Sequence, residues 1–110
     1  MAARKANAIW EGSIQEGRGQ MSLGSGAFEG AYSFQSRFGD EDAGTNPEEL
    51  VAAAHAGCFT MAFSLGLSQA GYPPQRLETS AVVHLNKVGE GFGITNIDLT
   101  TRGEIGRAHV

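Results

Sequence analysis

The sequence predicts an α+β fold: antiparallel strands first, one long central helix next, and a β-hairpin last. Three observations predict it. Residues 1–45 are rich in glycine and broken into short apolar stretches, a long apolar segment begins at Asn46-Pro47, and two alternating stretches flank the turn Gly89-Glu90-Gly91. Because no internal repeat or linker interrupts the chain, we expect a single domain of two packed layers.

The N-terminal part is expected to form a meander of three short strands, at residues 6–11, 19–23 and 31–35. Glycines separate these stretches, as is typical of tight turns between strands. An acidic segment at residues 40–44 follows. It has too few spaced oxygen ligands for an EF-hand, so we expect a solvated turn.

The helix has clear start and stop signals. Asn46 can cap it, Pro47 suits the first helical position, and Glu49 stands three residues after the cap, in a pattern similar to a capping box. The helix is expected to run to about Ala70, because Gly71 can adopt the left-handed conformation that ends helices and two prolines follow soon after.

Apolar side chains cover more than one face of this helix. One stripe at helical spacing consists of Leu50, Ala54, Cys58, Met61 and Leu65. Further apolar residues lie off the stripe, at Val51, Phe59, Phe63 and Leu67. A helix that is apolar on several faces is typical of a protein interior, so we expect a buried central helix.

The C-terminal part predicts a hairpin. Residues 77–86 alternate between apolar and polar side chains, and a second strand at residues 92–102 places Thr95, Ile97 and Leu99 on one face. The glycine-containing turn between the two stretches is short enough to pair them directly.

Composition excludes several classes of partner. The chain has 110 residues, with 8 basic and 12 acidic side chains and a net charge of −4. No cluster of lysine and arginine could neutralise a run of phosphates, so we expect no binding to nucleic acid or to anionic membranes. We find no apolar stretch of about 18 residues and no signal peptide, which predicts a cytoplasmic protein. A domain this small would gain from oligomerisation.

The single cysteine, Cys58, is either a buried structural residue or a nucleophile, since it cannot form an internal disulfide. His55, three residues earlier, raises a cysteine–histidine dyad, but a hydrolase would also need an orienting group and an oxyanion hole. His55 and Cys58 supply two zinc ligands, and His84 on a distant strand is a poor third, so we expect no metal.

Residues 44–64, GTNPEELVAAAHAGCFTMAFS, resemble the signature of the osmotically inducible protein C and organic hydroperoxide resistance family, OsmC/Ohr. Trp10-Glu11-Gly12, Ser36-Arg37-Phe38 and Gly93-Ile94-Thr95 extend the resemblance over nearly all of the chain before Gly103. The Asn-Pro-Glu-Glu-Leu and Ala-His-Ala patterns resemble the OsmC branch. The resemblance implies an intertwined homodimer with active sites at the subunit interface, and Gly57 and Gly66 would let another helix approach closely.

The resemblance also implies a thiol peroxidase without metal, haem or other cofactor. Cys58 would attack an organic hydroperoxide and become a sulfenic acid. In the family, a second cysteine in a C-terminal Cys-Pro-Val-Ser helix resolves that acid, and this sequence contains no such motif. The expected partners are therefore the hydroperoxide and a dithiol reductant such as a lipoylated protein.

A peroxidatic thiol needs a lowered pKa, and Arg37 is the best candidate cation because it stays charged and its planar fork can face both a thiolate and a peroxide. The resemblance assigns Arg37 and Glu48 to the active site. Ten residues of straight helix would separate Glu48 from Cys58 by roughly 15 Å. Either the helix starts later or bends near Gly57, or Glu48 acts through Arg37, in the same chain or from the partner chain. Glu48 and Glu49 can alternatively serve only the helix N-terminus, which we prefer for Glu49.

An apolar mouth near Cys58 would favour alkyl hydroperoxides over hydrogen peroxide. The side chains that could form it, or alternatively belong to an ordinary core, are Phe34, Phe38, Phe59, Met61 and Phe63.

Residues 104–110, EIGRAHV, resemble the in-frame translation of a common sequencing adapter. We therefore expect residues 1–103 to be the OsmC-like domain without its C-terminal helix and strand, followed by a non-native tail in which Arg107 and His109 have no function. The alternative to the peroxidase is a catalytically silent fragment that at most dimerises or binds a ligand.

Overall fold

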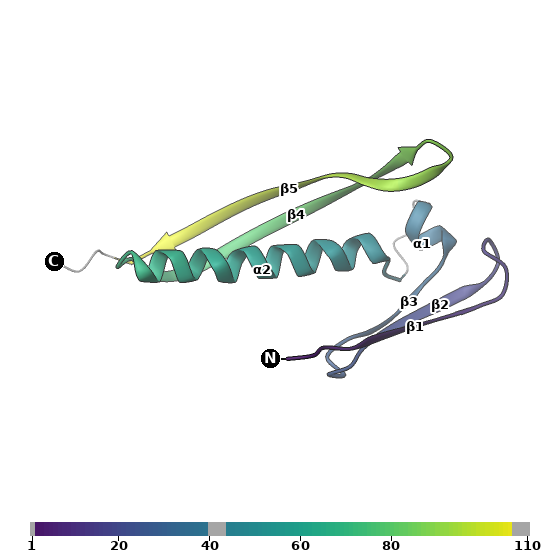
Figure 1. Ribbon diagram of the computed structural model, residues 1–110, viewed down its shortest axis with the longest axis horizontal. Coiled ribbons are helices and arrows are strands. Elements are labelled where there is room, and N and C mark those ends of the chain that lie inside the picture. Colours follow the sequence, from purple (N-terminus) through teal and green to yellow (C-terminus); the bar gives the residue numbers. More distant parts are fainter. Residues whose placement is uncertain (1, 40–43, 107–110) are drawn as a thin grey trace. The chain divides into compact units, whose positions relative to one another are not determined.

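The computed structural model describes residues 2–39 and 44–106, and it has the predicted α+β architecture of N-terminal antiparallel strands, a long helix and a C-terminal hairpin (Figure 1). Contacts group the chain into two compact units, Met1–Pro47 and Glu48–Val110. Each unit is described by itself.

The first unit is built on an antiparallel sheet with the strand order β1-β2-β3. Strand β1 spans Ala6–Glu11, β2 spans Arg18–Leu23 and β3 spans Glu29–Tyr32. The first two strands were predicted to within one residue. In the register, Gly19 of the central strand stands opposite both Trp10 and Tyr32, so the two aromatic rings meet across a residue without a side chain.

The third predicted strand was wrong beyond Tyr32, because a short helix, α1 (Phe34–Phe38), follows instead. Ser33 caps it: its hydroxyl accepts from the Ser36 N–H at 3.1 Å, and the Ser36 hydroxyl accepts from the Ser33 N–H at 2.8 Å. Such a reciprocal box usually has Glu or Gln in the second position. Because Ser36 stands in that position, the sequence did not indicate the start of the helix.

The end of the first unit is tied to Ser36, one of two buried polar residues. Its hydroxyl lies 2.8 Å from the carbonyl oxygen of Thr45, the other buried polar residue in the described part of the chain. The Thr45 N–H donates to Ala31 at 2.8 Å, and the Asn46 side-chain amide donates to the Ser36 carbonyl at 3.2 Å. The predicted acidic turn lies largely outside the described residues, which resume at Gly44.

The second unit contains the long helix α2 (Pro47–Gln69), which starts and ends where the sequence predicted. Gly71 has φ +94°, and its N–H bonds to the Ser68 carbonyl while the Tyr72 N–H bonds to the Leu67 carbonyl. This pair of bonds is the Schellman motif, which satisfies the last carbonyls of a helix. The predicted stop signal is confirmed.

The predicted hairpin is also confirmed, with longer strands than expected. Strand β4 spans Pro74–Val88 and β5 spans Gly91–Ile105, and Gly89 has φ +62° in the turn. Strand β5 extends to Glu104, opposite Arg76, and to Ile105. Residues 107–110 lie outside the described residues, and the adapter origin of 104–110 stays a prediction.

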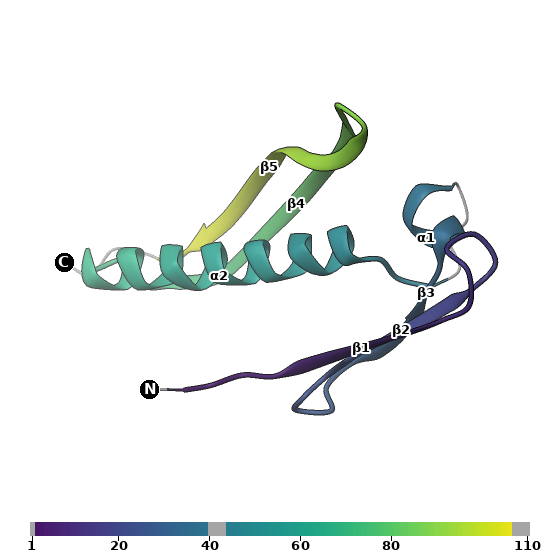
Figure 2. The ribbon, with the colours of Figure 1, turned by 45° about the vertical axis from the view of Figure 1, so that its right-hand side comes forward.

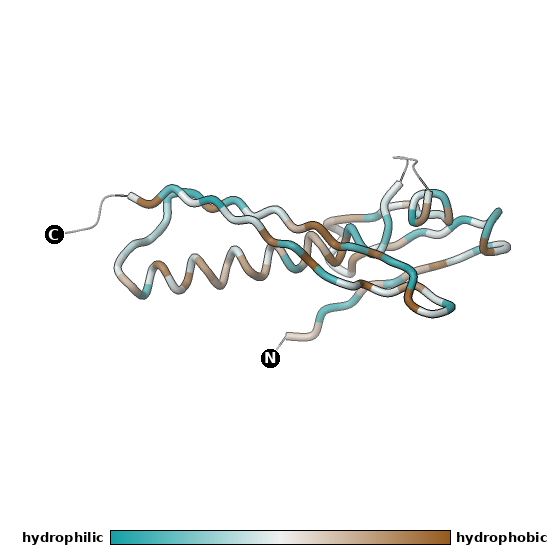
Figure 3. The backbone as a smooth tube through the Cα atoms, turned by 90° about the horizontal axis from the view of Figure 1, so that it is seen from above, coloured by the Kyte–Doolittle hydropathy of each residue, from teal (hydrophilic) through white to brown (hydrophobic). Residues whose placement is uncertain are grey.

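The expected burial of the central helix was wrong for this single chain, because no residue of α2 is buried. Both ribbon views show β4 starting beside the C-terminal half of α2 and moving away from the helix toward the β4–β5 turn (Figures 1 and 2). Apolar residues recur along the whole helix (Figure 3). Among the described residues no apolar side chain is buried, so the core that this pattern requires is not completed within one chain.

Helix α2 is also long and apolar enough to cross a membrane by length and composition, with a mean hydropathy of 1.6 over an 18-residue window. This differs from our expectation that no segment had such a character, because the alanines between the larger apolar residues raise the mean hydropathy. The core helix of a globular protein has the same composition.

Candidate functional site

Cys58 lies in the middle of α2 and is exposed. It lines a shallow groove of about 540 Å³ on the helix surface, together with Met61, Ala62, Ser64, Leu65 and Ser68. Met61 and Leu65 belong to the predicted stripe through Cys58, which is thereby confirmed. The thiol therefore opens onto a mainly apolar surface.

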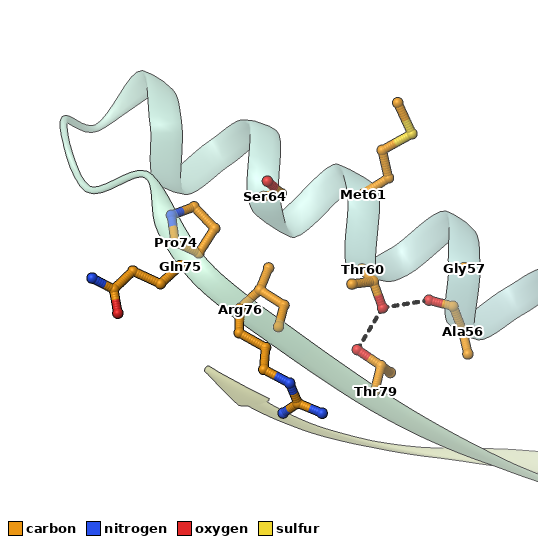
Figure 4. A pocket seen from close by; sticks show the side chains of 10 residues that line it. Ala56, Gly57, Thr60, Met61, Ser64, Pro74, Gln75, Arg76 and Thr79 are labelled. Atoms are coloured by element: carbon orange, nitrogen blue, oxygen red, sulfur yellow. Dashed lines mark hydrogen bonds between the residues drawn. The ribbon is translucent and has the colours of Figure 1, made fainter. Parts of the chain in front are cut away.

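A second groove, also of about 540 Å³, separates α2 from the start of β4 (Figure 4). From the helix it is lined by Ala56, Gly57, Thr60, Met61 and Ser64, and from the strand by residues 74–77 and Thr79. Cys58 is not among its lining residues. Figure 4 shows Met61 directed away from β4, on the side of the helix that faces away from the strand.

A chain of hydroxyl groups joins the helix to the hairpin. The Thr60 hydroxyl donates to the Ala56 carbonyl at 2.6 Å and is hydrogen-bonded to the Thr79 hydroxyl, also at 2.6 Å. The Thr79 hydroxyl in turn lies 3.1 Å from that of Thr101, its register partner in β5. Three neighbouring elements are thus linked through one row of threonines.

Arg37 lies in the last turn of α1, in the first unit. Its backbone N–H bonds to the Ser33 carbonyl at 3.1 Å, and its guanidinium carbon lies 5.1 Å from the centre of the Phe38 ring. An arginine over an aromatic face keeps its charge while its carbon stem is held. Cys58 belongs to the second unit.

Glu48 and Glu49 both lie in the first turn of α2. There they favour the positive end of the helix dipole. Because the helix is continuous from Pro47 and is drawn straight through Gly57 (Figures 1 and 2), Glu48 lies roughly 15 Å along the axis from Cys58. The late start and the bend considered above are wrong. An action of Glu48 through Arg37 stays a prediction.

The aromatic residues expected at the mouth form two separate pairs. Phe34 and Phe38 lie 5.1 Å apart, centroid to centroid, in the first unit, and Phe59 and Phe63 lie 6.0 Å apart on α2. Of the five predicted mouth residues, only Met61 lines the groove of Cys58.

The two described histidines, His55 and His84, are not grouped with Cys58 as metal ligands. His84 lies on the hairpin, where its Nε2 is 2.8 Å from a carboxylate oxygen of Asp98. His55 is exposed on α2. Across residues 2–39 and 44–106, no three histidine, cysteine, aspartate or glutamate side chains are grouped as metal ligands.

Sequence reasoning missed the threonine row. Two signals could have indicated it. Thr60 follows Ala56 by four residues, the spacing at which a helical threonine bonds back to a carbonyl. The second signal is weaker: pairing the hairpin through its turn alone would place Thr79 opposite Thr100, and the register shift between His84 and Leu85 brings Thr101 opposite Thr79 instead, where facing threonines commonly bond.

Comparison with known proteins agrees with this architecture. Residues 39–109 match the model of a family described as OsmC-like protein. The proteins named peroxiredoxin OsmC from Escherichia coli (strain K12) and from Shigella flexneri are each 50% identical to the chain over 97 residues. Each alignment covers 87% of this chain and 67% of the relative.

Solved structures with low sequence identity share the fold. An OsmC-like protein of unknown function from Vibrio cholerae matches with a TM-score of 0.74 at 18% identity, covering 100% of this chain and 79% of that one. An organic hydroperoxide resistance protein of Bacillus subtilis matches with a TM-score of 0.69 at 24% identity, covering 90% and 71%.

Proposed function

Because the chain belongs to the OsmC-like family, we propose that it is a peroxidase that reduces organic hydroperoxides to alcohols through Cys58. The observation that carries this proposal is the exposed thiol on a mainly apolar groove of α2. The name peroxiredoxin, given to the relatives that are 50% identical, supports the same chemistry.

The proposed reaction needs a thiolate and no cofactor. The Cys58 sulfur attacks the outer oxygen of the hydroperoxide, the O–O bond breaks, and the alkoxide leaves and takes up a proton to give the alcohol. The cysteine becomes a sulfenic acid. One thiol of a dithiol then displaces water from that sulfur, and the second thiol releases Cys58 as the reductant closes its own disulfide.

Arg37 is proposed to stabilise the thiolate and the departing alkoxide, since a guanidinium offers a fixed fork of donors. Glu48 is proposed to hold that guanidinium by an ion pair. Within one chain, its distance from Cys58 along α2 excludes a direct contact with the sulfur, so an action of Glu48 on Cys58 of the same chain has to pass through Arg37.

Organic hydroperoxides are proposed as the substrates because Met61 and Leu65 beside Cys58 are 79% and 59% exposed. Apolar surface in contact with water favours binding of an alkyl group over the small polar hydrogen peroxide.

A homodimer is proposed as the working form, since no apolar side chain among the described residues is buried in the single chain. A second copy covering α2 would supply the missing core. The proposed reductant is a dithiol such as a lipoylated protein, because this chain has one cysteine and cannot resolve its own sulfenic acid. A cytoplasmic location without nucleic-acid or membrane partners stays part of the proposal.

This function is tested by the rate at which the purified protein consumes cumene hydroperoxide or hydrogen peroxide, with dihydrolipoamide as reductant. We expect a fast first turnover with the organic peroxide, a slower one with hydrogen peroxide, and neither in Cys58→Ser. A folded protein without a Cys58-dependent first turnover would instead support the silent dimerising or binding domain, which the lack of a buried core also favours.

A further inference from the structure

Thr60 occupies a particular position relative to the proposed nucleophile. In an α-helix, successive residues are rotated by about 100°, so Thr60 points about 200° away from Cys58. The lining residues agree with this geometry: the two grooves share Met61 and Ser64 at their border, but Thr60 lines only the groove toward β4 and Cys58 lines only the other groove. The two side chains therefore occupy opposite faces of one helical turn.

The hydrogen bonds of Thr60 enclose that turn. Its hydroxyl bonds to the carbonyl of Ala56, two residues before Cys58, and to the hydroxyl of Thr79 on β4. Both bonds are 2.6 Å long and half-buried. Thr79 is itself held by Thr101 across the hairpin, so the anchor is a two-stranded element and not one mobile side chain.

This link is well placed to fix the rotation of α2. Within one chain, the groove around Thr60 leaves the space between helix and hairpin open, and no residue of α2 is buried, so few other contacts inside the chain hold the helix. A directional hydrogen bond sets an angle, whereas exposed apolar contacts allow rotation. Rotation of α2 by one residue would move the Cys58 thiol by about 100° around the axis.

We propose that Thr60 is a positioning residue for Cys58: by binding Ala56 and Thr79, it sets the rotation of α2 so that the thiol faces the apolar groove. This inference rests on the proposed function, because the groove is taken as the place where the hydroperoxide binds. Thr60 itself touches neither substrate nor reacting atoms.

The test is the second-order rate of the first turnover with cumene hydroperoxide, measured by rapid quench. Thr60→Val keeps the shape and removes the hydroxyl, and we expect a fall of about 10-fold, the scale expected for a small misplacement of a reacting group. Thr60→Ser, which keeps the hydroxyl, should stay within about 2-fold of the wild type.

Thr79→Val removes the same hydrogen bond by changing its partner on β4, and it replaces Thr60→Val in the test if that variant fails to fold. The double variant should be no slower than the slower of the two single variants, because the effects of two substitutions that remove the same bond do not add. Thr100→Val is the matched control. It changes a threonine of β5 that pairs with Ser80 and not with Thr79, and its rate should equal the wild type.

A Thr60→Val rate equal to the wild type would overturn the inference, as would an equal loss in Thr60→Ser. Additive losses in the double variant would also overturn it, since they would show two independent effects. A wild type without any Cys58-dependent turnover would overturn the proposed function instead, so the two failures are distinguishable.

Discussion

The rings of Trp10 and Tyr32 lie 5.5 Å apart, centroid to centroid, across Gly19 of strand β2. A Cβ atom at Gly19 would stand 2.6 Å from a carbon of Trp10 and 2.5 Å from a carbon of Tyr32, which is closer than real contacts allow. The pair thus depends on a glycine in the central strand, where a side chain would otherwise pack.

Gly19→Ala should therefore destabilise the first unit. Overpacking typically costs about 1–3 kcal/mol, which we expect as a lower free energy of unfolding by urea titration. Gly91→Ala is the control, because a Cβ at that strand glycine meets nothing within 4 Å. Equal stability of Gly19→Ala and Gly91→Ala would contradict the packing described for Trp10 and Tyr32.

Because no apolar side chain in residues 2–39 and 44–106 of one chain is buried, we expect the stability to depend on protein concentration. If a second copy covers α2, association is linked to folding and the melting temperature rises with concentration. Thermal melts at several concentrations, with sedimentation at each, measure this. A monomer whose melting temperature stays constant would contradict the homodimer.

Gly66→Ala examines whether a second helix approaches α2. A Cβ at Gly66 has open space within the chain, so alanine alone would stabilise the helix by about 1 kcal/mol. If another helix packs against this glycine, as we propose, the substitution weakens the dimer in sedimentation. A more stable protein with unchanged dimerisation would show that no helix approaches there.

Arg37→Lys separates the charge of Arg37 from its shape. Lysine keeps the charge and loses the planar fork, so we expect the first turnover with cumene hydroperoxide to slow by about 10-fold or more. Arg76→Lys is the control within the second unit, where Arg76 forms a surface ion pair with Glu78 at 2.7 Å. Equal rates for the two variants would remove Arg37 from the active site.

The Arg76–Glu78 pair predicts a small pH effect on stability. The hydrogen bond and the charge of Arg76 lower the pKa of Glu78 from its ordinary value. A carboxyl with a lowered folded-state pKa contributes stability above its unfolded pKa and loses it as the pH falls through the folded pKa. Thermal melts from neutral to acid pH should show a fall of the melting temperature in the wild type and a smaller fall in Glu78→Gln. The same pH dependence in both proteins would contradict a contribution of this ion pair to stability.

Local sequence signals predicted most of the fold. Pro47 and Gly71 marked the limits of α2 because helix ends depend on nearby residues. The glycine turn set the register of the hairpin only as far as Leu85, where a register shift that the sequence did not indicate begins. Helix α1 was missed because its cap uses the uncommon pair Ser33 and Ser36. The burial of α2 could not be predicted for one chain, since an apolar pattern shows that a surface needs covering and not which molecule covers it.

The candidate site was predicted less completely. The stripe through Cys58 follows from helical periodicity, and it correctly placed Met61 and Leu65 beside the thiol. Thr60 and its partner Thr79 were not recognised, because their contact joins elements that are 19 positions apart in sequence. Helical and strand periodicity each describe one element and carry no information about such a bond.

The most direct test of the central claim is the identification of Cys58 sulfenic acid. The protein is treated with one equivalent of cumene hydroperoxide in the presence of dimedone, which traps sulfenic acids, and the peptide carrying Cys58 is examined by mass spectrometry. The account predicts a dimedone adduct on Cys58 in near-stoichiometric yield, with cumyl alcohol formed in equal amount. An unmodified Cys58 and unconsumed hydroperoxide, in a protein shown to be folded, would contradict it.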